Sequence, residues 1–237
     1  MLVPSESRDR VEMRQLAIVA HELRNPLAAA WCAVRMLARS TACAREMEQV
    51  VPQIERQLGY IARIVDDLVD VASVTSGRLS LHKQRVDLSE VLDGAIHACR
   101  QRLDAGGYEF NVSMTMGPVL VHADPLRLTQ VFANLLDNAV KYSEPCGRIS
   151  VTLERRHDVA AVMVEDNGVG IRAEVLPRIF DLFVQAGTPM IGSSRGLGVG
   201  LAVAKQVVEE HGGRIEARSA GIGLGSRFTV RMPLANV

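Results

Sequence analysis

The first third of the chain carries two apolar stripes at helical spacing. Between residues 7 and 38, apolar residues recur every three or four positions, which predicts one amphipathic helix. After a polar break at residues 39–45, a second stripe alternates steps of three and four, which is typical of the seam of a helical bundle. The first stripe consists of Leu16, Ala20, Leu23, Leu27, Ala30, Val34 and Leu37, and the second of Val51, Ile54, Leu58, Ile61, Val65, Leu68 and Ala72.

Two long helices joined by a tight connection predict an antiparallel hairpin. A lone hairpin leaves much of its apolar stripe in water, whereas two hairpins paired across a homodimer bury it in a four-helix bundle. Pro52 interrupts the second pattern, because a proline inside a helix deletes a hydrogen bond and costs about 3 kcal/mol. We therefore expect the second helix to begin near Pro52 or to bend there.

The heptads stop at residues 73–77, and beyond them the pattern becomes mixed. Short β-rich stretches and helical patterns alternate there, which predicts one sheet backed by helices. The β-rich stretches are residues 109–114, 148–154, 159–165, 214–219 and 226–232, and the helical patterns are residues 88–103, 125–142 and 201–211. We expect a helical domain at residues 1–76 and an α/β domain at residues 77–237.

The composition excludes several classes of protein. Of 237 residues, 48% are hydrophobic and 23% are charged, as in ordinary globular proteins. Lys plus Arg and Asp plus Glu both number 27, so no overall charge favours nucleic acid or anionic lipid, and we expect no nucleic acid partner. Four scattered cysteines indicate reduced thiols and a cytoplasmic protein. No apolar run approaches the roughly 18 residues that span a bilayer, so no membrane insertion is expected.

A narrow polar stripe crosses the helix expected at residues 125–142. A solvated helix face is the simple explanation, but two asparagines one turn apart are poor helix formers on an exposed face. The amide oxygen of an asparagine suits Mg²⁺ already bound to a phosphate chain, and a lysine would supply a charge for phosphate. The stripe consists of Arg127, Gln130, Asn134, Asn138 and Lys141, which share one face.

A second motif, at residues 165–170, follows directly after a β-rich stretch. Its Asp-Asn-Gly sequence is a turn signal, and a plain turn is the simple alternative. Gly168 and Gly170 would also let a flat ligand approach the backbone closely. The carboxylate of Asp166 could accept a hydrogen bond from the exocyclic amine of adenine and would repel the carbonyl of guanine.

A third motif alternates glycines with Leu and Val directly before the helix expected at residues 201–211. Gly196, Gly198 and Gly200 would leave backbone N–H groups and the positive end of the helix dipole free for phosphate. Alone, the motif fits a flexible loop equally well. It differs from the Walker A pattern and from the dinucleotide fingerprint.

The fourth motif lies on the first long helix. His21 and Asn25 fall on its solvated side, away from the apolar stripe, and Pro26 predicts a bend one turn later. Most surface histidines have no function. The adjacent carboxylate of Glu22, however, could fix the tautomer of His21 and accept a proton while the other ring nitrogen attacks.

Together these motifs resemble the catalytic core of a sensor histidine kinase of a two-component system. The resemblance covers the chain from about Met13 to Leu234 and implies a dimeric phosphotransfer hairpin followed by a Bergerat-type ATP-binding α/β sandwich. In the family's order, residues 21–27 resemble its H box, residues 134–143 its N box, residues 165–171 its G1 box, residues 179–183 its F box and residues 196–201 its G2 box.

The resemblance implies ATP and Mg²⁺ as cofactors and a response-regulator receiver domain as partner. It makes His21 the phosphoacceptor, Glu22 the residue that activates it, and Asn138 the Mg²⁺ ligand, supported by Asn134. The phosphoryl group would pass from His21 to an aspartate of the receiver. For the nucleotide it implies contacts of Lys141 with phosphate, Tyr142 with adenine or ribose, Asp166 with the adenine amine, Gly168 and Gly170 with the adenine pocket, Arg195 with the terminal phosphates, and Gly196, Gly198 and Gly200 with the phosphate chain.

Departures from the family pattern leave other functions open. Many relatives carry threonine where Asn25 stands, and either side chain could orient a water that hydrolyses the receiver's phosphoaspartate, so phosphatase activity is a hypothesis. Few residues precede His21, so we expect sensory input from a domain or partner outside this chain. One alternative is an ATP-hydrolysing conformational clamp, although it would want a carboxylate where Asn134 stands. Another is a non-catalytic dimeric scaffold that binds receivers.

Overall fold

The computed structural model describes residues 5–39, 44–75, 80–185 and 197–235, and for His21 it describes the backbone but not the side chain. The chain forms two compact units, one made mainly of the residues up to Ala72 and the other mainly of the residues from Ser73 onward, with Leu197 grouped with the first. The domain boundary expected between residues 76 and 77 lies outside the described residues and stays a prediction.

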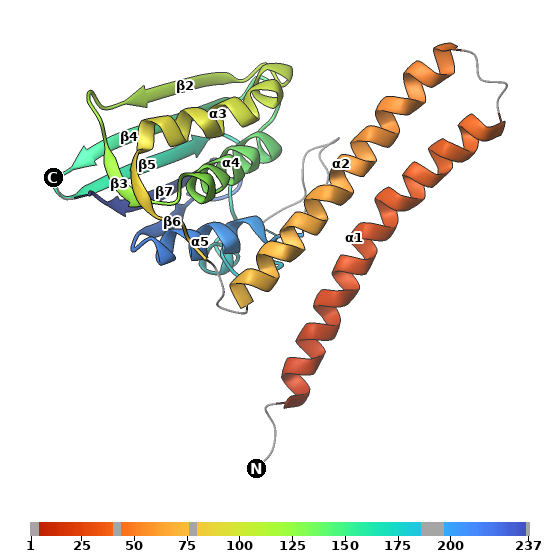
Figure 1. Ribbon diagram of the computed structural model, residues 1–237, viewed down its shortest axis with the longest axis horizontal. Helices are drawn as coiled ribbons and strands as arrows, with labels where there is room; N and C mark the ends of the chain where they lie inside the picture. Colours follow the sequence, from red (N-terminus) through yellow and green to blue (C-terminus); the bar gives the residue numbers. More distant parts are fainter. Residues whose placement is uncertain (1–4, 40–43, 76–79, 186–196, 236–237) are drawn as a thin grey trace. The chain divides into compact units, whose positions relative to one another are not determined.

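The first unit is a hairpin of helices α1 (Ser5–Arg39) and α2 (Ala44–Thr75), as the two stripes predict (Figure 1). The expectation that the second helix begins near Pro52 is wrong, because α2 starts at Ala44 and continues through the proline. A proline deletes one helical hydrogen bond, and the half-buried Val50 and Ile54 on either side keep this stretch in the seam. The bend at Pro52 stays a prediction.

The second unit contains a five-stranded sheet in the order β2-β4-β5-β7-β6, in which β2 is parallel to β4 and the other neighbours are antiparallel. A separate two-stranded sheet pairs β1 with β3. The strands are β1 (Gln84–Asp87), β2 (Glu109–Met114), β3 (Leu120–Ala123), β4 (Arg148–Arg156), β5 (Val159–Asp166), β6 (Arg214–Arg218) and β7 (Ser226–Pro233). The helices are α3 (Leu88–Ala105), α4 (Pro125–Tyr142) and α5 (Gly200–Glu210), with a 3₁₀ turn, η1, at Leu176–Arg178.

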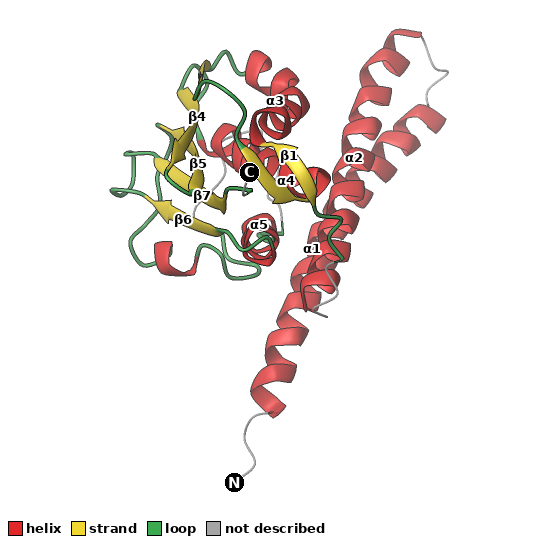
Figure 2. Ribbon diagram, turned by 60° about the vertical axis from the view of Figure 1, so that its left-hand side comes forward, coloured by secondary structure: helices red, strands yellow, loops and turns green. Residues whose placement is uncertain are grey.

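Helices α3, α4 and α5 lie on the same side of the five-stranded sheet, which gives a two-layer α/β sandwich (Figure 2). The core between the layers includes Phe132 and Leu135 of α4 and Val162 of β5, all fully buried. The sequence predicts the five strands of this sheet and its three helices, and the structure confirms them with small shifts at their ends. It does not predict β1 and β3, which are four residues long and pair only with each other.

Local side chains fix where α3 and α4 begin. The carboxylate of Asp87 accepts a hydrogen bond from the Ser89 N–H at 3.0 Å, and that of Asp124 accepts one from the Arg127 N–H at 3.1 Å. Pro125 follows Asp124 at the first helical position, where its missing N–H costs nothing. These caps fix the residues at which the two helices begin. Among the described residues, no helix is long and apolar enough to cross a bilayer.

Candidate functional site

The polar face of α4 is not a solvated surface. All five predicted members of the stripe are half-buried, including Asn134 and Asn138. The side-chain amide of Asn134 donates to the carbonyl oxygen of Gly200 at 3.4 Å, so α4 contacts the first residue of α5. Within the described part of the chain, the amide of Asn138 makes no hydrogen bond and is available to a ligand.

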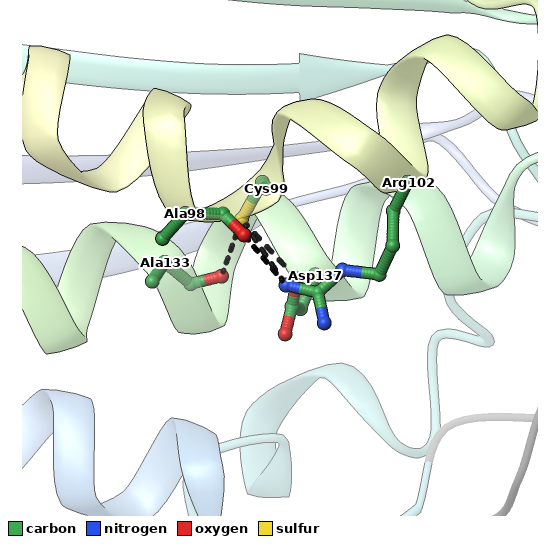
Figure 3. Close-up of polar contacts among 5 residues, drawn as sticks. All are labelled: Ala98, Cys99, Arg102, Ala133 and Asp137. Atoms are coloured by element: carbon green, nitrogen blue, oxygen red, sulfur yellow. Dashed lines mark hydrogen bonds and ion pairs between the residues drawn. The ribbon is translucent and has the colours of Figure 1, made fainter. Parts of the chain in front are cut away.

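A polar cluster between α3 and α4 holds the asparagine helix in place (Figure 3). The guanidinium of Arg102 on α3 contacts Oδ1 of Asp137 on α4 at 2.6 Å, and the Cys99 thiol donates to the same oxygen at 3.2 Å. Burial and the Asp137 carboxylate raise the pKa of Cys99 to about 11, so the thiol stays protonated and unreactive at neutral pH. Asp137 directly precedes Asn138, so this cluster constrains the backbone that carries that amide.

A buried histidine connects the N-terminus of α4 to the C-terminus of α5. Nε2 of His211 accepts from the Asp124 N–H at 2.9 Å, and Nδ1 lies 2.7 Å from the Val207 carbonyl, which requires the neutral Nδ1–H tautomer. Burial lowers the pKa of His211 below its ordinary value, which keeps this tautomer neutral. The histidine thus joins the start of α4, the helix that carries Asn134, to the end of α5.

The carboxylate of Asp166, at the end of β5, is held by two donors. Its Oδ1 accepts from the Gly168 N–H at 2.9 Å, and its Oδ2 accepts from the Ser226 hydroxyl at 2.5 Å. Burial raises the pKa of Asp166 above its ordinary value despite these hydrogen bonds. Sequence reasoning did not single out Ser226 as a site residue, because only the pairing of β5 with β7 brings it to Asp166.

The glycines that follow Asp166 allow close backbone packing. A Cβ on Gly168 would overlap the carbonyl oxygen of Tyr142, and the N–H of Val169 donates to that same oxygen at 2.9 Å. Gly170 has a φ of +69°, and a Cβ there would overlap the carbonyl oxygen of Gly221. The turn after β5 therefore lies directly against the end of α4, where Tyr142 stands.

Lys141 and Tyr142 end the polar face of α4. The ammonium of Lys141 lies 5.0 Å from the centre of the Tyr142 ring, which is a cation–π distance. Both side chains are half-buried. Asn138 lies one helical turn from Tyr142 and one turn from Asn134, so α4 connects the turn after β5 with the glycines before α5.

The described part of the third motif also has the expected backbone character. Gly198 has a φ of +74°, which favours glycine, and its carbonyl accepts from the Phe183 N–H at 3.0 Å. Gly200 begins α5, next to the amide of Asn134. The structure therefore places Gly200 beside Asn134, whereas Gly198 lies against Phe183 and Val184. The predicted contacts of Arg195 and Gly196 with phosphate lie outside the described residues.

The fourth motif lies within α1. Asn25 is exposed, as the helical spacing predicts, and Glu22 is half-buried. The hydroxyl of Tyr60, on α2, donates to Oε2 of Glu22 at 2.8 Å. Sequence reasoning missed Tyr60, because its contact with Glu22 depends on how the two helices pair.

Comparisons with known proteins match both units. Residues 12–77 match the family model of the His Kinase A (phospho-acceptor) domain, and residues 123–236 match that of the histidine kinase-, DNA gyrase B-, and HSP90-like ATPase. The mycobacterial sensor histidine kinase MprB is 32% identical in a solved structure with a TM-score of 0.58; the match covers 65% of this chain and 100% of that one. The chain belongs to the histidine kinase family.

Two longer histidine kinases match nearly the whole chain. This chain is 32% identical to the circadian input-output histidine kinase CikA of Synechococcus elongatus. The match covers 92% of this chain but only 29% of CikA. The chain is 25% identical to the full-length histidine kinase ShkA, solved in complex with AMPPNP, with a TM-score of 0.69; the match covers 94% of this chain and 46% of ShkA. The fold is therefore the expected helical hairpin followed by the ATPase sandwich.

The chemistry of the donor set fits a magnesium-bound adenine nucleotide. Asn138 offers a neutral amide oxygen with no hydrogen bond in the described residues, which suits a metal held mainly by phosphate oxygens. Lys141 supplies a positive charge one turn away. At the other end, Asp166 offers a carboxylate that prefers to receive a proton or a hydrogen bond, because burial raises its pKa.

Proposed function

We propose that this chain is an ATP-dependent protein histidine kinase. It would phosphorylate His21 and then pass the phosphoryl group to an aspartate of a response-regulator receiver domain. The observation that carries the proposal is the course of α4, which joins Asn134 to Gly200 at the start of α5 and Tyr142 to the turn after Asp166. One helix thus connects phosphate-binding chemistry with adenine-binding chemistry in a chain that also carries the phosphoacceptor motif.

In the proposed reaction, one ring nitrogen of His21 attacks the γ-phosphorus of ATP in line with the leaving group. The new P–N bond forms as the bond to the β–γ bridging oxygen breaks, and ADP leaves. The proton on the other ring nitrogen passes to the carboxylate of Glu22. Bound Mg²⁺ would neutralise charge on the phosphates, with Asn138 as its protein ligand. Lys141 would hold the phosphate chain, and the positioning of the two reactants supplies much of the acceleration.

Adenine selectivity would come from Asp166. Its carboxylate is oriented by Ser226 and by the Gly168 N–H, and each of these donors engages a different oxygen. A carboxylate retains lone pairs after accepting one hydrogen bond on each oxygen, so it can also accept from the exocyclic amine of adenine. Guanine presents a carbonyl at that position, and repulsion between the two oxygens would exclude it.

We also propose that the chain works as a homodimer through the hairpin. Several apolar side chains remain exposed along one side of each helix at heptad steps of seven residues. Their exposed fractions are 54% for Leu27, 44% for Val34, 38% for Val51, 55% for Leu58 and 47% for Val65. A second hairpin would cover this stripe and form a four-helix bundle, as is typical of the phosphoacceptor domain family.

A response-regulator receiver domain is the proposed partner, and a sensory domain or a separate sensor is proposed to control the kinase. The chain spans 29% of the length of CikA. Phosphatase activity toward the phosphorylated receiver is a second proposed function, favoured by the exposed amide of Asn25 one turn from His21. Such an amide could orient the attacking water.

Incubation with γ-labelled ATP and Mg²⁺ tests the function and separates it from the alternatives. Label on the protein that is lost in acid and kept in base supports a histidine kinase. Release of inorganic phosphate with no labelled protein would indicate the ATP-hydrolysing clamp, and neither product would indicate the scaffold. His21→Ala should abolish the label and leave ATP binding intact.

A further inference from the structure

The hydrogen bond between Tyr60 and Glu22 crosses the hairpin at the proposed reaction centre. Tyr60 lies on α2 and Glu22 on α1, and both side chains are half-buried. The hydroxyl of Tyr60 donates to Oε2 of Glu22 at 2.8 Å, which is a normal distance for a charge-assisted hydrogen bond. Glu22 directly follows His21, so this hydrogen bond restrains the carboxylate that is nearest to His21 in the sequence.

The hydrogen bond from Tyr60 engages Oε2 of the Glu22 carboxylate and does not engage Oε1. A glutamate side chain has three rotatable bonds, and fixing Oε2 against an aromatic hydroxyl removes much of that freedom. Oε1 is then presented in a defined direction. Pro26 offers no N–H to the backbone carbonyl of Glu22, so the helix lacks one of its own hydrogen bonds at this turn. The hydrogen bond from Tyr60 therefore contributes more to holding Glu22 in place.

We propose that Tyr60 is a positioning residue for the autophosphorylation of His21, acting through Glu22. This inference rests on the proposed function and extends it to a residue on the second helix. During attack on the γ-phosphorus, the imidazole proton passes to Oε1 of Glu22 as the P–N bond forms and ADP departs. Tyr60 keeps its own proton throughout and holds Oε2, so that Oε1 can receive the transferred proton.

The test compares four variants of the full chain by initial rates of ³²P incorporation across a range of ATP concentrations. Tyr60→Phe removes the hydroxyl and keeps the ring, Glu22→Gln removes the base, and the double variant joins the two changes. Ile64→Val, at a buried position one turn further along α2, is the control for weakened hairpin packing. Thermal unfolding of each variant measures how far packing has changed.

We expect Tyr60→Phe to lower kcat about tenfold and to leave KM for ATP within about twofold, because the nucleotide site is unaltered. Glu22→Gln should lower kcat about a hundredfold, as for loss of a general base. The double variant should match Glu22→Gln, since the side chain at position 22 can then no longer accept the proton, wherever it is held. Ile64→Val should keep the wild-type kcat even where its unfolding temperature falls as far as that of Tyr60→Phe.

Three results would overturn the inference. One is a Tyr60→Phe enzyme as fast as the wild type, and another is equal slowing by Tyr60→Phe and Ile64→Val. The third is a double variant slower than Glu22→Gln by the full factor of Tyr60→Phe, since Tyr60 would then act independently of Glu22. The proposed function fails differently, through a wild-type protein that binds ATP and gains no label on His21.

Discussion

Asp166→Asn should weaken ATP binding without weakening the fold. Burial raises the pKa of Asp166 above 3.8, so the folded state binds a proton more tightly than the unfolded state. As the pH rises from 3.8, the pKa of the unfolded state, to the higher pKa of the folded state, the free energy of unfolding therefore falls. At neutral pH the ionised carboxylate opposes folding. Asparagine is uncharged and can keep both contacts, by accepting from the Gly168 N–H and donating to the Ser226 hydroxyl.

The loss of binding can be worked from the hydrogen bond that adenine would make. A hydrogen bond to a charged group contributes about 1.5–3 kcal/mol, and replacing the carboxylate by an amide removes its charge. This energy corresponds to a rise in the Kd for ATP of about 10-fold to 150-fold. Unfolding of the nucleotide-free protein should occur at the wild-type temperature or above it.

Two assays on the same samples separate these effects. Isothermal titration calorimetry gives the Kd for ATP, and differential scanning calorimetry gives the unfolding temperature without nucleotide. Ser226→Ala is the matched control, because it removes one donor and keeps the charge of Asp166, and it should weaken ATP binding less than Asp166→Asn. An Asp166→Asn protein that binds ATP normally, or one that unfolds well below the wild-type temperature, would contradict the reasoning.

Three further predictions concern other parts of the chain. The pKa of His211 lies below 6.5, so the free energy of unfolding should fall as the pH drops below about 6.5, by at most about 1.4 kcal/mol per pH unit. His211→Gln should remove this pH dependence in unfolding measured from pH 8 to 5. The same substitution at the exposed His122 should leave the dependence in place. If the chain forms the proposed homodimer, Leu58→Glu should convert it to monomers in sedimentation velocity, because it places a charge in the apolar stripe, whereas Arg56→Glu should not. Asn25→Ala should slow dephosphorylation of a receiver and preserve autophosphorylation, and equal rates of dephosphorylation would exclude the phosphatase role.

The parts of the fold that follow local rules could be predicted from the sequence. Helix α4 has the predicted bounds because Asp124 caps it, Pro125 suits its first position and its apolar residues recur at helical spacing. The strands of the large sheet carry enough β-branched and alternating residues to stand out. The polar stripe of α4 also made Asn134 and Asn138 candidates for the site, since asparagine is unusual on an exposed helix face, and their role stays a prediction.

The parts that depend on distant contacts could not be predicted. β1 and β3 are too short to show a period, and Gln84 pairs with Ala123, which lies far along the chain. The hydrogen bonds of Ser226 with Asp166 and of Tyr60 with Glu22 likewise join residues that no local pattern relates. The expectation that α2 begins near Pro52 is wrong, because the helix starts at Ala44 and continues through the proline.

The central claim is that a phosphoryl group of ATP comes to rest on the imidazole of His21. The most direct measurement is ³¹P NMR of the chain after incubation with Mg²⁺ and ATP, combined with mapping of the modified peptide by mass spectrometry under alkaline conditions. The account predicts a phosphoramidate signal, one phosphoryl group on the peptide that contains His21, and neither in His21→Gln. ATP bound in the second unit with no phosphorus on that peptide, or with the modification on another residue, would contradict it.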